Sequence, residues 1–178
     1  IQATSPAGAE GKTSTASNLA AVLAQAGHRV ALVDANLREP RMHELFSVPQ
    51  SPGFADLLLG LDPVDVGTDV SVDATNTLTV YSSGTVPSNP SELLSGPQTP
   101  QVLAELGARF DYVIVDSASA LEVSDAVELS SHVDALVLVV QSERTTRDQL
   151  TQAIGRLSRV AAPVVGIVLN HAPTRTSR

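Results

Sequence analysis

The chain has 178 residues, no cysteine and a formal net charge of −8 at pH 7. Without cysteine, this sequence offers no disulfide, thiolate metal site or iron–sulfur ligand, and its acidic balance excludes a general binder of nucleic-acid backbones. No apolar run approaches the length of a membrane span, and residues 1–5 are not typical of a signal peptide. We predict one soluble domain over residues 1–178, taken from a longer polypeptide because the sequence opens inside its first expected strand.

Apolar segments alternate with helix-period segments along the chain. This alternation predicts a three-layer αβα sandwich of the α/β class with a mainly parallel central sheet. A helix with apolar residues at helix spacing follows the first strand, and Gly27 is its expected C-terminal cap. A late helix is expected to begin at Thr145 or Thr146. Strands are expected at residues 1–4, 29–33, 78–81, 112–115, 135–140 and 164–169.

Residues 5–13 (SPAGAEGKT) lie between the first strand and the first helix. Small residues let successive backbone N–H groups of such a loop face one point, which the positive end of the next helix also faces. The only lysine, Lys12, would reach the β- and γ-phosphates of a nucleotide, and the Thr13 hydroxyl would bind Mg²⁺. Pro6 replaces the usual first glycine, and a turn capped by Thr13 is the alternative interpretation. The expected nucleotide-binding residues are Gly8, Ala9, Glu10, Gly11, Lys12, Thr13 and Ser14.

Two further expected strands end in an aspartate. Asp34 follows the strand at 29–33, and Asp116 follows the strand at 112–115. Ligands of an open parallel sheet bind beyond the carboxyl ends of its strands, so these carboxylates and the phosphate loop should converge. A carboxylate at the end of a buried strand needs a cation or hydrogen bonds, and Mg²⁺ is such a cation. The sequence therefore predicts a Mg-ATP site with Thr13, Asp34 and Asp116 at the metal.

Residues 39–77 interrupt the alternation of strands and helices. They contain short apolar pieces near residues 54–61, followed by a stretch with four aspartates and no basic residue. We expect this segment to be an excursion over the edge of the sheet that binds the nucleotide.

Several segments carry a more specific likeness. Residues 33–43 (VDANLREPRMH), 84–94 (GTVPSNPSELL), 110–116 (FDYVIVD), 123–126 (VSDA) and 166–170 (GIVLN) occur in this order. Together they resemble the bacterial tyrosine kinases that control capsule and exopolysaccharide synthesis, which have Walker A, A′ and B motifs. The second segment is the most specific, because it is similar to a Pro-Asn-Pro-x-Glu-Leu-Leu segment that generic P-loop proteins lack. The resemblance spans nearly the whole chain.

The resemblance implies a P-loop NTPase fold and an ATP- and Mg²⁺-dependent protein-tyrosine autokinase. Carried onto this sequence, it makes Lys12, Asp34 and Asp116 the catalytic residues, with Asp34 as the base for the tyrosine hydroxyl. Asn170 is expected to contact the adenine edge, because an amide both donates and accepts hydrogen bonds. The implied partners are a transmembrane activator of the chain-length-determinant type, or a fused membrane region, and further copies of the kinase. The implied location is cytoplasmic, at the inner face of the membrane.

Three departures from the family pattern keep other functions open. Asn36 stands where the family usually has aspartate, residues 118–119 (AS) replace Pro-Pro, and no tyrosine cluster follows Asn170. Tyr81 and Tyr112 lie inside expected strands, and we expect neither to accept phosphate. One alternative is a catalytically impaired ATP-binding assembly module of the same pathway. Another is a spatial-organisation ATPase of the Min or Par type, which usually has an extra lysine where this chain has Ala7.

Some polar residues have simpler structural interpretations. Asp125, after Ser124, either tunes the nucleotide site or caps a helix, and Asn89 with Glu92 is expected to form a capping box. Arg144 could face phosphate, a partner subunit or solvent.

Overall fold

The computed structural model describes residues 1–173. Within them, seven strands form one sheet in the order β3-β4-β2-β5-β1-β6-β7. All neighbouring strands of this sheet are parallel except β3 and β4. The strands are β1 (Gln2–Thr4), β2 (Val30–Asp34), β3 (Thr68–Ser71), β4 (Thr77–Tyr81), β5 (Tyr112–Asp116), β6 (Leu136–Gln141) and β7 (Val164–Asn170).

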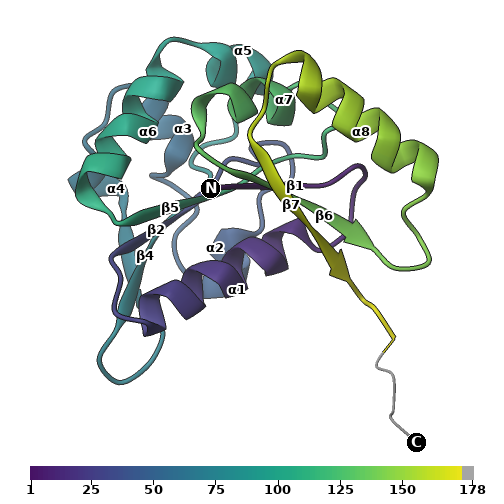
Figure 1. The fold of residues 1–178 in the computed structure, drawn as a ribbon. Coiled ribbons are helices and arrows are strands. Elements are labelled where there is room, and N and C mark those ends of the chain that lie inside the picture. The colour runs from purple at the N-terminus through teal and green to yellow at the C-terminus, as the bar shows by residue number, and fades with distance from the viewer. Residues whose placement is uncertain (174–178) are drawn as a thin grey trace, which may run out of the picture.

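Helices cover both faces of the sheet (Figure 1). The lower face in this view carries α1 (Lys12–Gln25) and α2 (Met42–Phe46). The upper face carries α3 (Phe54–Leu58), α4 (Pro63–Val66), α5 (Pro90–Ser95), α6 (Gln98–Arg109), α7 (Asp125–Leu129) and α8 (Arg147–Arg159), and a 3₁₀ turn, η1 (Ser130–His132), follows α7. The predicted three-layer αβα sandwich with a mainly parallel central sheet is confirmed.

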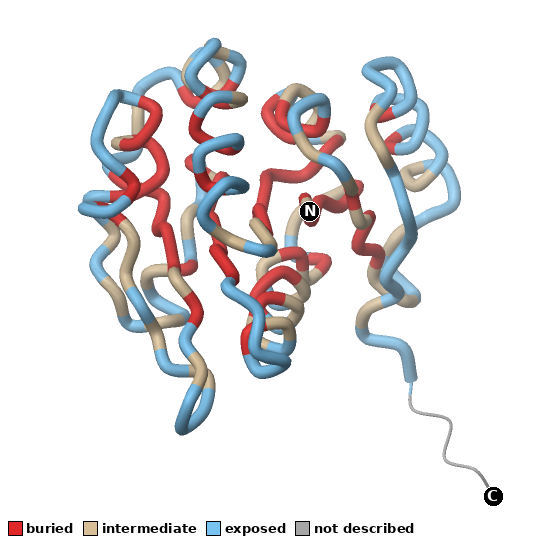
Figure 2. Tube along the Cα trace, turned by 60° about the vertical axis from the view of Figure 1, so that its left-hand side comes forward, coloured by how far each residue is buried: buried red, intermediate tan, exposed pale blue. Residues whose placement is uncertain are grey.

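Apolar residues form buried clusters between the sheet and its helices. Figure 2 shows buried residues along the strands and on parts of the helices. On the α1 side, Ala16 and Ala20 are fully buried against strand residues such as Leu32. These small side chains let α1 approach the sheet closely, which brings the loop before α1 near the ends of β1 and β5. On the other side, Phe54 and Leu106 belong to a second buried cluster.

The predicted strands and helix ends are largely confirmed. Each of the six expected strands is present, with ends shifted by at most a few residues. Gly27 has a φ of 89° and donates its N–H to the Ala24 carbonyl, as a left-handed residue that ends a helix should. The Thr146 side chain accepts a hydrogen bond from the Gln149 N–H and caps α8.

The expectation for residues 39–77 is wrong for most of the segment. β3 pairs antiparallel with β4 at the edge of the sheet, separated from β1 by three strands. Phe54 and Leu57 of α3 are buried in the core cluster, which draws this part of the chain onto the sheet face rather than over the nucleotide edge. Its aspartates order surface turns: Asp62 caps α4, and Asp73 accepts hydrogen bonds from residues 75 and 76.

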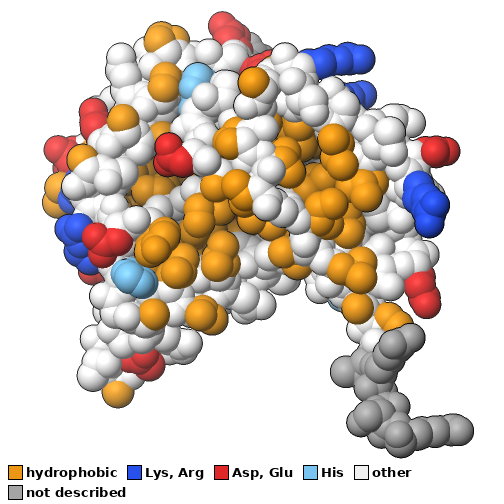
Figure 3. Space-filling model, viewed as in Figure 1, with side chains coloured by type: hydrophobic (Ala, Val, Ile, Leu, Met, Phe, Trp, Pro, Cys, Tyr) orange, Lys and Arg blue, Asp and Glu red, His pale blue; other side chains and the backbone are white. Residues whose placement is uncertain are grey.

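The opposite edge strand, β7, exposes apolar side chains. Ile167 is 50% exposed and Leu169 58%, and Val168, on the opposite face, is 37% exposed, so residues on both faces of the strand contact solvent. Figure 3 shows hydrophobic side chains gathered across the middle of this face, including the region where β7 lies in Figure 1. This edge lies beyond β6, whose buried residues Leu136 and Leu138 complete the core against α8.

Candidate functional site

The loop between β1 and α1 forms one wall of a pocket beyond the carboxyl ends of the parallel strands. The pocket has a volume of about 520 Å³. Its lining residues are Gly8, Ala9, Gly11, Lys12, Thr13, Ser14, Asn36, Arg38, Glu39, Arg41, Ala118, Ser119, Glu122, Val123 and His171. Most of the predicted phosphate-loop residues therefore face one cavity, as does the start of the 39–77 segment.

The backbone of this loop adopts left-handed conformations at two positions. Ala9 has a φ of 59° and Gly11 a φ of 90°, and α1 begins immediately afterwards at Lys12. Alternation of left-handed and right-handed residues turns successive N–H groups toward one side, which is the geometry of an anion-binding nest. A Cβ atom at Gly11 would lie 1.9 Å from the Asn170 side-chain nitrogen, so a side chain larger than hydrogen requires movement here.

Residues behind the loop hold it in this shape. The buried Glu10 carboxylate accepts a hydrogen bond from the Ala7 N–H at 2.8 Å and another from the Thr145 hydroxyl. The Asn170 amide donates to the Glu10 carbonyl at 3.1 Å. The Glu10 carboxylate therefore faces the loop and Thr145, and Glu10 is not among the residues that line the pocket, so its contact with a nucleotide stays a prediction. Asn170 lies against the loop, and its adenine contact stays a prediction.

The two strand-end aspartates lie side by side. Asp34 is in register with Asp116 on the neighbouring strands β2 and β5. The Thr13 hydroxyl donates to Asp116 Oδ2 at 2.5 Å, and the Lys12 ammonium donates to the Ser119 hydroxyl at 3.0 Å. The structure therefore brings together the lysine, the hydroxyl and both carboxylates that the sequence singled out.

Burial controls the protonation of both carboxylates. It raises the pKa of Asp116 to about 7, against the lowering effect of the Thr13 hydrogen bond, and the neighbouring Asp34 charge raises it further. Burial also raises the pKa of Asp34 to about 6, although backbone N–H groups of Met42, Arg41 and Asn36 donate to it. Both carboxyl groups resist ionisation because they are buried next to each other. A cation bound beside them would stabilise their ionised forms.

The donor set fits Mg²⁺. Asp116 Oδ1 is buried and has no hydrogen-bond partner among residues 1–173, whereas both oxygens of Asp34 accept backbone hydrogen bonds. A buried carboxylate oxygen without a partner is costly, and a hydroxyl with one or two carboxylates is the protein contribution that Mg²⁺ commonly takes. Thr13 and Asp116 would hold the ion. Asp34 lies next to Asp116, and its oxygens are already occupied by backbone hydrogen bonds.

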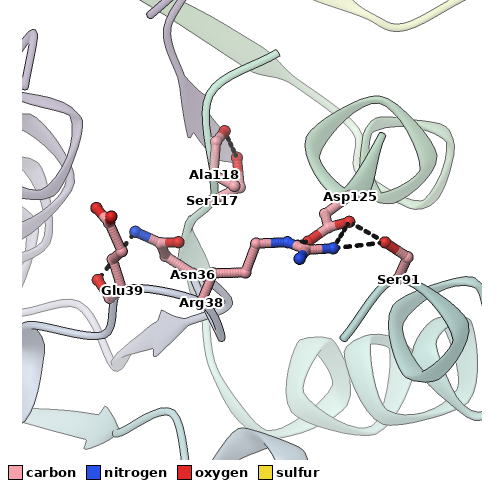
Figure 4. Close-up of polar contacts among 7 residues, drawn as sticks. All are labelled: Asn36, Arg38, Glu39, Ser91, Ser117, Ala118 and Asp125. Atoms are coloured by element: carbon pink, nitrogen blue, oxygen red, sulfur yellow. Dashed lines mark hydrogen bonds and ion pairs between the residues drawn. The ribbon is translucent and has the colours of Figure 1, made fainter. Parts of the chain in front are cut away.

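A second polar cluster joins three segments of the likeness described above (Figure 4). Arg38 donates from Nε to Asp125 at 2.8 Å and from Nη2 to Ser91 at 2.8 Å. The Ser91 hydroxyl also donates to Asp125 at 2.5 Å. Burial raises the pKa of Asp125, but the hydrogen bonds from Arg38 and Ser91 outweigh burial and lower it. Asp125 is therefore an ion-pair residue and not the predicted helix cap.

Replacement of Arg38 by methionine should destabilise the fold by about 1–3 kcal/mol, because Asp125 is only 2% exposed and would lose its cation. Arg29→Met is the matched control, since the Arg29 pair with Asp111 has a similar 2.7 Å contact but both side chains are exposed. The control should change stability much less than Arg38→Met does, because exposed ion pairs contribute little to the free energy of unfolding. Urea unfolding measures both variants, and equal losses would contradict the assigned burial.

The structure gives roles to two further amide side chains. Asn36 donates from its side chain to the Glu39 carbonyl at 3.0 Å, a bond that a carboxylate could not form (Figure 4). The amide therefore stabilises the loop after β2. Asn89 precedes α5 but makes no capping bond to the backbone; its amide donates to Glu92 instead, so the predicted capping box is wrong.

Comparison with known proteins places the chain in a family. A family model described as ParA, NUBPL iron-transfer P-loop NTPase, matches residues 1–177. Tyrosine-protein kinase YwqD of Bacillus subtilis (strain 168) is 35% identical over 170 residues, which are 96% of this chain and 71% of YwqD. The solved kinase domain of Escherichia coli tyrosine kinase ETK has a TM-score of 0.92 at 32% identity, over 99% of this chain and 69% of that chain. The chain belongs to the bacterial tyrosine-protein kinase family of P-loop NTPases.

The match covers different shares of these bacterial tyrosine kinases. Tyrosine-protein kinase ptk of Acinetobacter johnsonii is 32% identical over 170 residues, but the chain spans only 23% of its length. A solved structure of cobyrinic acid a,c-diamide synthase from Mycobacterium smegmatis, with a bound ATP analogue and magnesium, has a TM-score of 0.83 at 18% identity. That likeness concerns the fold alone.

The tyrosines of this bacterial tyrosine kinase domain lie away from the pocket. Tyr81 is 1% exposed, and its hydroxyl donates to the Pro63 carbonyl at 3.3 Å. Tyr112 is half-buried in β5 and packs its ring edge-on against His28. Neither ring is among the pocket residues, in agreement with the expectation that neither accepts phosphate.

Sequence reasoning gave no functional role to two pocket residues, Ser119 and Glu122. Ser119 accepts the Lys12 hydrogen bond, and the Glu122 carboxylate accepts a hydrogen bond from the Gly8 N–H at 2.8 Å. Both lie in the loop between β5 and α7, at sequence separations of 107 and 114 residues from their partners. The only signal was the position of this loop directly after Asp116.

Proposed function

We propose that this domain binds Mg-ATP and transfers the γ-phosphoryl group to tyrosine. The observation that carries the proposal is the partnerless buried oxygen of Asp116 beside the Thr13 hydroxyl, at the foot of a loop shaped to bind anions. Membership of the bacterial tyrosine kinase family supports the reaction class. We further propose that the domain acts in capsule or exopolysaccharide synthesis, as the resemblance in its sequence implies.

The proposed reaction asks the protein mainly for positioning and charge neutralisation. A tyrosine oxygen forms a bond to the γ-phosphorus, the bond from that phosphorus to the β–γ bridging oxygen breaks, and the phenolic proton leaves to a base. The Lys12 side chain and the N–H groups of the loop would neutralise the phosphates. Mg²⁺, held by Thr13 and Asp116, would supply further charge neutralisation at the β- and γ-phosphates.

Asp34 is the proposed base, and its surroundings define what this role requires. Its pKa of about 6 suits proton transfer near neutral pH. Its side chain is only 1% exposed and is held by N–H groups of Arg41 and Met42. To meet a tyrosine hydroxyl directly, the Asp34 carboxylate must first be uncovered by movement of residues 35–42, because N–H groups of Arg41 and Met42 hold it. Asp34 would therefore act as the base only after that movement.

The phosphate acceptor is proposed to be a tyrosine of another polypeptide segment, because Tyr81 is buried and Tyr112 lies in the sheet. We also propose self-association and a transmembrane or fused membrane partner at the inner face of the membrane. In support, several related kinases are several times longer than the matched region. Among residues 1–173, none of the helices has the length and apolar character needed to span a bilayer.

Incubation of the purified domain with radiolabelled ATP, Mg²⁺ and a tyrosine-rich peptide tests the proposal. Label on tyrosine is expected, and Lys12→Met should reduce its rate by at least about a hundredfold while retaining the circular dichroism of the wild type. Tight nucleotide binding without transfer would favour the ATP-binding assembly module instead. ATP hydrolysis without tyrosine labelling would favour an ATPase of the Min or Par type.

A further inference from the structure

A carboxylate of this protein already contacts the phosphate loop. Glu122 Oε1 accepts a hydrogen bond from the Gly8 N–H at 2.8 Å, and a Cβ atom on Gly8 would lie 3.1 Å from the same oxygen. Both residues line the pocket. The Glu122 side chain is exposed, and Gly8 is the first glycine of the loop that precedes Lys12. An anion of the chain itself thus meets the loop where the proposed function needs a phosphate.

The backbone around Glu122 is fixed to the same loop. The Ala120 N–H donates to the Ser5 carbonyl at 2.8 Å, and the Leu121 N–H donates to the Pro6 carbonyl at 3.2 Å. The Arg156 guanidinium donates to the carbonyls of residues 120 and 121 from the other side. These bonds hold the Glu122 backbone at a constant distance from Gly8, so its carboxylate is presented to the loop at a high effective concentration.

We propose that the Glu122 carboxylate is an internal anion that competes with a phosphate of the nucleotide for the Gly8 N–H and thereby weakens nucleotide binding. This inference rests on the proposed nucleotide site. One N–H donates one good hydrogen bond, so a phosphate oxygen and the carboxylate cannot both take it. The two anions also repel each other, although the pocket residues Lys12, Arg38 and Arg41 reduce this repulsion. Binding therefore includes displacement of the Glu122 side chain.

The structure offers variants that separate the hydrogen bond from the charge. Glu122→Ala removes both. Glu122→Asp keeps the charge but shortens the side chain by one methylene, about 1.5 Å, so the 2.8 Å contact cannot form while the backbone stays anchored. Glu39→Gln removes a negative charge from the same pocket without removing a bond to the loop, because Glu39 contributes only its carbonyl to Asn36.

Titration calorimetry with Mg-AMP-PNP, a non-hydrolysable ATP analogue, tests the inference. Glu122→Ala should bind about three- to tenfold more tightly than the wild type, as expected for loss of one charge-assisted but exposed competing bond. Glu122→Asp should recover most of this gain, and Glu39→Gln should recover little of it. Equal affinity of wild type and Glu122→Ala would overturn the inference, as would Glu122→Asp behaving like the wild type.

A Lys12→Met sample in the same series separates this inference from the proposed function. If the wild type binds and Lys12→Met does not, the nucleotide site stands, and the Glu122 variants alone decide the inference. If neither the wild type nor any Glu122 variant binds the analogue, the nucleotide site itself fails, and the inference falls with it.

Discussion

Replacement of Asp116 by asparagine is expected to stabilise the metal-free protein at pH 7.5 and to abolish Mg²⁺-dependent nucleotide binding. Burial raises the pKa of Asp116 to about 7, so ionising it in the folded protein costs free energy that the unfolded chain does not pay. Asparagine keeps an oxygen for the Thr13 hydroxyl and carries no charge. We expect a gain of about 1–3 kcal/mol, or several degrees in Tm, from the rise of this pKa above the ordinary aspartate value.

The sign of the pH dependence follows from the raised pKa. Between about pH 4 and pH 7 the folded protein holds a proton on Asp116 that the unfolded chain has lost, so the stability contributed by this group falls as pH rises. The advantage of Asp116→Asn should therefore be largest above pH 7 and should shrink toward pH 5. Thermal unfolding in EDTA at several pH values measures it.

An exposed aspartate provides the control for this prediction. Asp111 pairs with Arg29 at the surface, and the hydrogen bonds from Arg29 lower the pKa of its carboxyl. Asp111→Asn should therefore not raise the Tm at pH 7.5. An Asp116→Asn protein that is less stable than the wild type at pH 7.5, or that binds Mg-nucleotide equally well, would contradict the assigned burial and metal role.

Replacement of Gly11 by alanine is expected to destabilise the protein by about 2–4 kcal/mol and to abolish nucleotide binding. The φ of 90° disfavours any side chain, by about 1–2 kcal/mol. The new Cβ would also lie 1.9 Å from the Asn170 amide, which must move and lose its bond to the Glu10 carbonyl. The phosphate loop would then lose the hydrogen bond from Asn170 that holds it in its nucleotide-binding shape.

Gly27 separates these two costs, because it has nearly the same φ, 89°, and a Cβ atom added there would meet no other atom within 4 Å. Gly27→Ala should therefore show only the backbone cost, about 1 kcal/mol, and should bind nucleotide like the wild type. Urea unfolding of the two variants gives the difference between them. If Gly11→Ala and Gly27→Ala lost equal stability, the close packing of Asn170 on the loop would be refuted.

The core of the site could be predicted because it depends on local rules of parallel sheets. Successive parallel strands end at one edge, so Asp34, Asp116 and the loop before Lys12 had to converge once the strands were recognised. The structure agrees in register and in contacts, including the hydrogen bond from Thr13 to Asp116. The helix ends at Gly27 and Thr146 could also be predicted, because they depend on only a few neighbouring residues.

The rest depends on contacts between distant parts of the chain. Arg38 and Asp125 are 87 residues apart, and the residues next to Asp125 suggested a helix cap or a role at the nucleotide site rather than an ion pair. Residues 39–77 show no sustained periodicity, and only burial of Phe54 and pairing of β3 with β4 reveal that they pack on the sheet. Glu122 belongs to no recognised sequence motif. It lies near the phosphate loop because the backbone N–H groups of residues 120 and 121 donate to the carbonyls of residues 5 and 6.

A Mg-nucleotide site at the loop before Lys12 underlies every functional role proposed for this protein. Its most direct test is titration calorimetry of the wild type and Lys12→Met with Mg-AMP-PNP, repeated in EDTA. Saturable binding by the wild type is expected, with much weaker binding after removal of Mg²⁺ and none detectable for Lys12→Met. A wild type that gives no heat and no rise in Tm, or a Lys12→Met protein that binds equally well, would contradict it.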